Sequence, residues 1–198
     1  MNIALRQARM TRDQFLDWAG AQNEHYEFDG YEPVLMTGGT CVHSQINQNL
    51  YFALQSRLRG GSAWQVLGPD AGLATVGNAV RYPDALATRE KFDGTARLTP
   101  GVAVVFEVVS PTSGRMDRIV KVREYQAVST ILRYLIIEYA SAGVTVLSRA
   151  DGAADWTSKA LVAEDILPLP ELGIEFPVSD LYYNVDLPAD GEAAPATV

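Results

Sequence analysis

Residues 102–109 limit how this chain can fold more than any other stretch. They read Val-Ala-Val-Val-Phe-Glu-Val-Val, an apolar and mostly β-branched run that contains one carboxylate, Glu107. Such a run is typical of a strand buried on both faces of a central sheet. An ionised carboxylate in that place costs several kcal/mol unless it is paired, hydrogen-bonded or bound to a metal. Identifying the group that compensates Glu107 is therefore the route to function.

The segment after this strand supplies a candidate partner. Residues 110–114, Ser-Pro-Thr-Ser-Gly, break the strand, and a helical pattern follows. On that helix Asp117 and Lys121 are four residues apart and share a face. The expected buried side consists of Met116, Ile119, Val120 and Ala127. Lys121 would lie beside that side and lean over the strand end that carries Glu107; the alternative is a solvated lysine paired with Asp117.

Composition restricts the class of protein. The chain has 198 residues and a formal net charge of −8, which argues against coating nucleic acid by bulk electrostatics. The single cysteine, Cys41, excludes an internal disulfide and fits a reducing cytoplasm. No stretch has the roughly eighteen apolar residues of a membrane span. We therefore expect a cytoplasmic protein without a membrane partner.

The remaining pattern alternates between helical and strand-like segments. Thr11 and Gln14 form a capping-box signature at the start of a first helix. Asp29-Gly30 predicts a hairpin, and Pro33 places its second strand at or near an edge. Residues 41–58 predict a second helix. Further strands are expected at residues 64–67, 72–76, 80–88, 131–139, 144–149 and 156–162, with a last short helix after Pro177.

These segments predict an α/β (α+β) fold in which helices flank one mixed central sheet that carries additional hairpins. A single domain is expected over residues 1–187. Residues 188–198 are small, acidic and proline-containing, so a disordered tail is expected there.

A second carboxylate, Asp84, follows a proline in Arg81-Tyr82-Pro83-Asp84. Proline removes a ladder donor and often marks an irregularity, so Asp84 can point out of the sheet into a cleft. Asp84 and Glu107 belong to consecutive predicted strands. If these strands are neighbours, the two carboxylates can bind Mg²⁺ or Mn²⁺, with water and substrate phosphate completing the shell. Lys121 could then position water or offset charge on the phosphate.

Five motifs follow one another along the chain: the Asp29-Gly30 hairpin, Tyr82-Pro83-Asp84, residues 105–111 (Val-Phe-Glu-Val-Val-Ser-Pro), Asp117 to Lys121, and Tyr125. In this order they resemble the Uma-type restriction endonucleases, a branch of the PD-(D/E)XK nuclease superfamily. The resemblance implies a restriction-endonuclease-like core and a metal-dependent endonuclease that hydrolyses DNA. It also makes a homodimer plausible, since superfamily members often pair to cut both strands.

The resemblance assigns roles residue by residue. Asp84 and Glu107 match the metal-binding carboxylates, and the Val108 carbonyl could assist them. The lysine normally two residues after the glutamate is absent, because Val109 stands there, and Lys121 takes its role. Glu27 matches a further acidic position of the site. His43 also matches a commonly polar position, without a specified role.

The sequence leaves alternatives open for Glu107 and for the function of the chain. Glu107 could form a structural ion pair with Arg133 or Lys121, and the whole chain could be a catalytically inactive nuclease-fold module for binding or assembly. A local basic excess favours a weak, salt-dependent contact with DNA. It consists of Arg115, Arg118, Lys121, Arg123 and Arg133 against Asp117 and Glu124.

Overall fold

The computed structural model describes residues 10–109 and 115–187 and is built around one large sheet. Its six strands run in the order β10-β9-β8-β7-β6-β3. The sheet is mixed, because β7 is parallel to β8 and antiparallel to β6. The strands are β3 (Gln65–Leu67), β6 (Ala85–Thr88), β7 (Val102–Val109), β8 (Arg133–Glu138), β9 (Gly143–Ser148) and β10 (Thr157–Val162).

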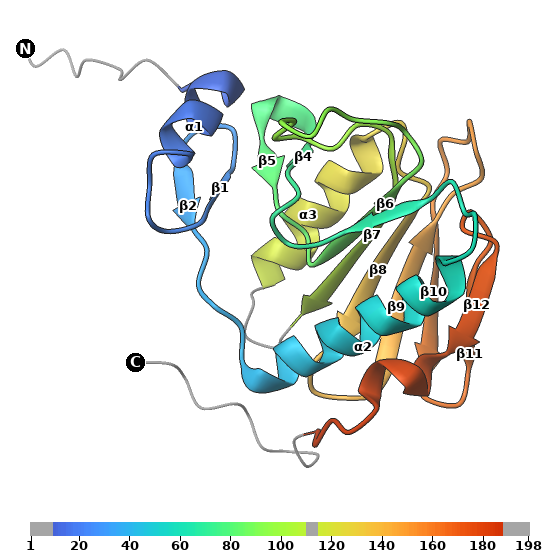
Figure 1. Ribbon diagram of the computed structural model, residues 1–198. Helices are drawn as coiled ribbons and strands as arrows, with labels where there is room; N and C mark the ends of the chain where they lie inside the picture. Colours follow the sequence, from blue (N-terminus) through green and yellow to red (C-terminus); the bar gives the residue numbers. More distant parts are fainter. Residues whose placement is uncertain (1–9, 110–114, 188–198) are drawn as a thin grey trace, which may run out of the picture.

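A smaller sheet of four strands, ordered β2-β1-β5-β4, lies beside the large one with the first helix (Figure 1). Its elements are α1 (Arg12–Ala19), β1 (Tyr26–Phe28), β2 (Pro33–Leu35), β4 (Leu73–Ala74) and β5 (Val80–Arg81). β11 (Ile166–Leu169) and β12 (Ile174–Pro177) form a two-stranded sheet. Two short 3-10 helices are η1 (Val76–Asn78) and η2 (Val178–Tyr182).

Two long helices cover opposite faces of the large sheet (Figure 1). They are α2 (Cys41–Leu58) and α3 (Arg115–Ala127). Along β7, Val104, Phe106 and Val108 pack in the cluster that contains α2, whereas Val105 and Val109 pack in the cluster that contains α3. Because side chains alternate along a strand, Glu107 shares the α3 face with its neighbours at 105 and 109.

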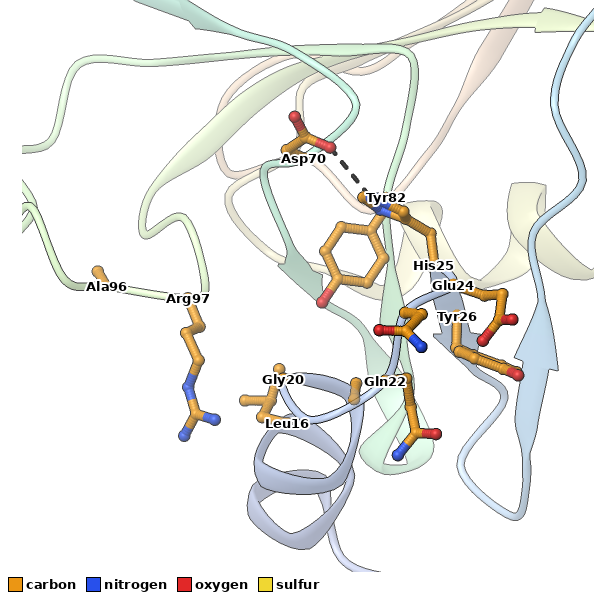
Figure 2. A pocket seen from close by; sticks show the side chains of 12 residues that line it. Leu16, Gly20, Gln22, Glu24, His25, Tyr26, Asp70, Tyr82, Ala96 and Arg97 are labelled. Atoms are coloured by element: carbon orange, nitrogen blue, oxygen red, sulfur yellow. Dashed lines mark ion pairs between the residues drawn. The ribbon is translucent and has the colours of Figure 1, made fainter.

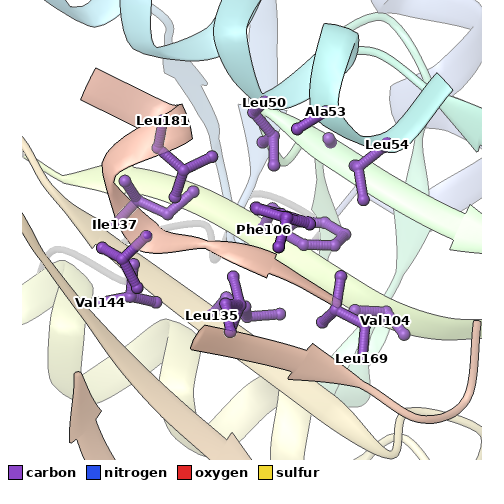
Figure 3. Close-up of a cluster of buried hydrophobic side chains, with 14 of the residues drawn as sticks. Leu50, Ala53, Leu54, Val104, Phe106, Leu135, Ile137, Val144, Leu169 and Leu181 are labelled. Atoms are coloured by element: carbon purple, nitrogen blue, oxygen red, sulfur yellow. The ribbon is translucent and has the colours of Figure 1, made fainter. Parts of the chain in front are cut away.

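The core on the α2 side explains why β7 is fixed in place. Leu50 and Leu54 of α2 lie over Phe106 of β7 and Leu135 of β8 (Figure 3). All four side chains are fully buried, and every residue of β7 is buried. The prediction of a buried central strand at 102–109 is therefore confirmed, and β7 provides a rigid base for Glu107.

Several local predictions are confirmed. The Thr11 hydroxyl accepts from the Gln14 N–H, and the Gln14 side chain accepts from the Thr11 N–H, which completes the capping box. β1 and β2 form the hairpin around Asp29-Gly30, with β2 at the sheet edge as Pro33 indicated. α2 has the predicted bounds.

Other predictions need correction. The run 80–88 is not one strand: it splits into β5 and β6, which belong to different sheets, because Pro83 lies at the break and has no N–H for a ladder. Asp84 lies in that break rather than inside a strand. Besides the large mixed sheet, the described residues form a four-stranded and a two-stranded sheet, and the pairing of β11 with β12 was not predicted.

The buried face of α3 also differs from the prediction. Ile119 is 43% exposed and Ala127 is exposed, whereas Glu124 and Tyr125 are buried. Hydrophobic periodicity misplaced this face because the helix directs charged and hydroxyl groups inward.

The predicted break at 110–114 and the predicted tail at 188–198 lie outside the described residues. Within the described ranges, no helix has the length and apolar character needed to cross a membrane.

Candidate active site

A cavity of about 470 Å³ opens at the carboxyl end of β7, where the large and small sheets meet. It collects the site residues that the sequence predicted. These lining residues are Glu27 of β1, His43 of α2, Asp84, Glu107 and Val108 of β7, and Lys121 of α3. The residues Glu27, Asp84 and Glu107 are 7–9% exposed, so the cavity gathers buried acidic groups.

Asp84 is held mainly by α2. Its Oδ1 accepts from Asn47 Nδ2 at 2.8 Å and lies 3.2 Å from His43 Nε2, and its Oδ2 accepts from the Val108 N–H at 2.7 Å. The Tyr51 hydroxyl donates to the Asp84 carbonyl at 2.6 Å. His43, Asn47 and Tyr51 recur at four-residue spacing on the helix, so one face of α2 presents all three to Asp84.

These contacts set the protonation of the pair formed by Asp84 and His43. Burial alone would raise the pKa of Asp84, but the hydrogen bond and charge of His43 outweigh it and lower the pKa below 3.8. The same hydrogen bond raises the pKa of His43 above 6.5 despite its burial. Asp84 is therefore an ionised candidate for a metal ligand. The contact with Asp84 Oδ1 also shows what His43 does in the fold: it helps to hold Asp84 in place.

Glu107 points to the α3 side of the sheet and meets two groups of that helix. The Tyr125 hydroxyl donates to its Oε1 at 2.7 Å, and Lys121 Nζ lies 3.1 Å from the same oxygen. Burial raises the pKa of Glu107 to about 7, with Lys121 opposing and Asp84 adding to the shift. Lys121 is thus the group that compensates the acid in the apolar strand.

Lys121 bridges two carboxylates that come from different sheets. Its Nζ lies 3.1 Å from Glu107 Oε1 and 3.1 Å from Glu27 Oε1. Burial lowers the pKa of a lysine, but the charges of Glu107 and Glu27 raise the pKa of Lys121 above 10.5. The side chain is 16% exposed, so the alternative of a solvated lysine is wrong, while the side chain of Asp117 lies outside the described residues.

Sequence reasoning missed the residues that hold Glu27. Arg81 Nη1 donates to Glu27 Oε2 at 3.1 Å, and the Tyr82 N–H donates to Glu27 Oε1 at 3.3 Å. Arg81 also forms a two-bond fork with Glu124, through Nε at 2.8 Å and Nη2 at 2.7 Å. One feature of the sequence could have pointed to Glu124. It follows Lys121 by three residues, which places both side chains on one face of α3.

The oxygen donors suit a hard divalent cation that keeps most of its water. No group of three or more acidic, His or Cys side chains in the described residues is arranged as a metal cage. Mg²⁺, however, usually binds through one or two carboxylates and retains several waters. Within the described ranges, the contacts of Glu107 with Lys121 and Tyr125 both end on Oε1, which leaves Oε2 for a ligand there. The buried Oδ1 of Asn47, beside Asp84, has no donor in the described part of the chain and would be satisfied by an ordered water.

Two arginines of the predicted basic excess are paired with glutamates, and the side chain of Arg115 lies outside the described residues. Arg118 lines the cavity but forms a fork with Glu138, with both distances 2.9 Å. Arg133 pairs with Glu171 at 2.8 and 3.0 Å, at the far end of β8 from the cavity. Arg133 therefore belongs neither to the patch nor to Glu107, and that part of the prediction is wrong.

Tyr82 lines both this cavity and a second hollow of about 460 Å³, and Figure 2 shows the second hollow. In Figure 2 its ring lies between the His25–Asp70 pair and residues Leu16 and Gly20 at the end of α1. Burial raises the pKa of the Tyr82 hydroxyl. None of the predicted site carboxylates lines this hollow, so the cavity at β7 is the candidate active site.

Three comparisons relate the chain to known proteins. The sequence pattern of one family, Uma2, described as "Putative restriction endonuclease", matches residues 12–179. A relative from Synechocystis sp. (strain ATCC 27184 / PCC 6803 / Kazusa), "Uncharacterized protein slr1290", is 27% identical over 177 residues, or 88% of this chain and 92% of the relative.

A solved structure from Anabaena variabilis ATCC 29413, described as a "putative nuclease belonging to DUF820", is similar with a TM-score of 0.69. The two are 14% identical, and the match covers 87% of this chain and 97% of the other. At that identity the likeness shows a shared fold, and it confirms the predicted fold class.

Proposed function

The chain belongs to the Uma2 family, and from that premise we propose that it is a metal-dependent endonuclease that hydrolyses phosphodiester bonds in DNA. Family and fold are those of a restriction-endonuclease-like nuclease. The proposal adds the substrate, the metal dependence and the residues.

One observation carries the proposal: Lys121 reaches Glu107 at 3.1 Å although Val109 stands where the superfamily lysine is normally found. The lysine thus joins the carboxylate pair from α3 instead of from β7. Two carboxylates and one ammonium at one cavity are the groups that metal-assisted phosphodiester hydrolysis requires.

In this proposal Asp84 and Glu107 hold Mg²⁺ or Mn²⁺, with the Val108 carbonyl as a further oxygen donor. When bound, the ion would polarise the phosphate and lower the pKa of coordinated water. Lys121 orients the attacking water or offsets charge that develops on the phosphate. Glu27 keeps Lys121 at the cavity. Tyr125 fixes the orientation of Glu107 through its 2.7 Å hydrogen bond.

The direct test is plasmid cleavage with Mg²⁺ or Mn²⁺, comparing wild type with Asp84→Asn. We expect the wild type to cleave and the variant to lose at least about a hundredfold in rate, because an amide is a poor ligand for a hard cation. EDTA should abolish wild-type cleavage. Asp180→Asn is the matched control, since Asp180 pairs with Arg57 away from the cavity. Equal cleavage by wild type and Asp84→Asn would rule the proposal out.

A second candidate is a catalytically inactive nuclease-fold module for binding or assembly. The contacts of Glu107 with Lys121 and Tyr125 favour it, because they satisfy the buried acid without a metal. This candidate requires that the protein show no divalent-ion affinity and that Glu107→Gln retain partner binding. Isothermal titration of the metal-free protein with Mn²⁺ separates the two candidates.

A further inference from the structure

Behind the candidate active site lies a continuous chain of buried ionic contacts centred on Arg81. Its guanidinium uses Nε and Nη2 for Glu124 and Nη1 for Glu27. Glu124 also accepts from the Thr75 hydroxyl at 3.1 Å. Arg81 is 6% exposed and does not contact either metal-ligand candidate.

Stability alone is a weak explanation for this arrangement. Buried ion pairs lose so much hydration that well-packed apolar residues often stabilise a fold as well. The protein also contains an arginine fork of the same kind, Arg133 with Glu171, with side chains 11% and 12% exposed. That fork ends at one carboxylate. Arg81 instead has a third contact, and this contact leads through Glu27 to Lys121.

We propose that Arg81 is a positioning residue that, anchored by Glu124, sets Glu27 in the orientation that holds Lys121 at Glu107. This inference rests on the proposed function for Lys121. Arg81 engages Oε2 of Glu27, while Lys121 lies against Oε1. The carboxylate plane is thereby fixed from behind, and Lys121 keeps one location between Glu27 and Glu107.

Only a guanidinium fits this role. It presents several donors in a rigid plane and can bind Glu124 bidentately while a further donor reaches Glu27. A lysine at this position has one compact ammonium and cannot reproduce the fork. Arg81→Lys therefore keeps the charge and removes the geometry.

Steady-state cleavage kinetics test the inference with Arg81→Lys and Arg81→Met, matched by Arg133→Lys and Arg133→Met. For the Arg81 variants we expect kcat to fall by about ten- to a hundredfold, while KM for DNA and the Mn²⁺ concentration for half-maximal rate stay unchanged. The Arg133 variants should retain wild-type kcat. If Arg81→Met does not fold, Arg81→Lys carries the test.

A double-mutant cycle separates positioning from general destabilisation. If Arg81 acts through Glu27, the double variant Arg81→Lys with Glu27→Gln should have the same kcat as Glu27→Gln alone. Additive losses would overturn the inference, and so would equal losses in the Arg81 and Arg133 variants.

A measurement without metal or DNA makes the outcome independent of cleavage. Mass spectrometry after brief treatment with an amine-acetylating reagent reports the reactivity of Lys121. We expect at least about a threefold rise in Arg81→Lys and no change in Arg133→Lys, since a lysine whose contact with Glu27 is loosened is freer to react. Unchanged reactivity in Arg81→Lys would overturn the inference. If the wild type lacks cleavage while Arg81→Lys still shows this rise, the proposed function alone is refuted.

Discussion

At the residue scale, Glu107 is an acid whose pKa lies close to neutral pH. Burial raises its pKa to about 7, while Lys121 and Tyr125 stabilise the ionised form. The unfolded chain releases this proton near 4.5, so the folded protein binds the proton more tightly between these two values. In the metal-free protein, Glu107 therefore opposes folding as pH rises.

This predicts a falling free energy of unfolding between pH 4.5 and 7 that levels off above pH 7. Each pH unit between the two pKa values is worth about 1.4 kcal/mol, so the loss is on the order of 3 kcal/mol. Glu107→Gln should flatten that part of the profile. Urea denaturation in EDTA at several pH values measures it.

The matched control is Glu171→Gln, which replaces a carboxylate of similar burial and leaves Glu107 intact. It should keep the wild-type slope. A Glu107→Gln profile as steep as the wild-type profile would show that Glu107 titrates at its ordinary value.

The sequence could indicate the candidate metal ligands and the candidate lysine, but not the residues that hold them in place. Asp84, Glu107 and Lys121 stand in recognisable motifs, and the structure brings them to one cavity. Arg81 lies in a short polar-apolar alternation, and Glu124 lies on a helix rich in charge, so both resemble surface residues. Their burial depends on the packing of the small sheet against α3, which no local pattern encodes.

At the element scale, α2 serves both the core and the site. Leu50, Ala53 and Leu54 pack on the large sheet, while His43, Asn47 and Tyr51 hold Asp84. The bounds of this helix were predictable because its apolar residues recur at helical spacing and glycines follow it. The break between β5 and β6 was only half visible: Pro83 indicated an irregularity, but the change of sheet depends on long-range pairing.

Leu50→Ala should lower the free energy of unfolding by about 2–5 kcal/mol, because the side chain is fully buried and leaves a cavity. Phe52→Ala is the control on the same helix. Phe52 is 75% exposed, so its removal should change stability by no more than about 0.5 kcal/mol. Urea denaturation of both variants measures these changes. Equal losses of unfolding free energy in Leu50→Ala and Phe52→Ala would contradict the packing of α2 on the large sheet.

At the scale of the whole molecule, the candidate site is assembled from two sheets and two helices. Glu27 and Arg81 belong to the small sheet, Glu107 belongs to the large one, and Lys121 joins them from α3. A cation that binds only this assembled site stabilises the whole fold by mass action.

Saturating Mn²⁺ should therefore raise Tm. At about a hundred times Kd the gain is roughly 2.7 kcal/mol, equivalent to about 5–10 °C for a domain of this size. EDTA should reverse the rise, and Asp84→Asn should remove it while Asp180→Asn retains it. Differential scanning calorimetry measures the shifts, and an equal rise in wild type and Asp84→Asn would place the ion elsewhere.

Pro83, at the crossing between the two sheets, has a consequence for affinity. A proline has a fixed φ and no N–H to leave unsatisfied, so the chain passes from β5 to β6 through a stiff link. Asp84 follows that link directly and is already restrained by α2 and by the Val108 N–H. The conformational entropy of ordering this candidate ligand is lost during folding, before any cation or substrate arrives. Binding at this cavity should consequently approach lock-and-key behaviour at Asp84, with little rearrangement of the backbone around it.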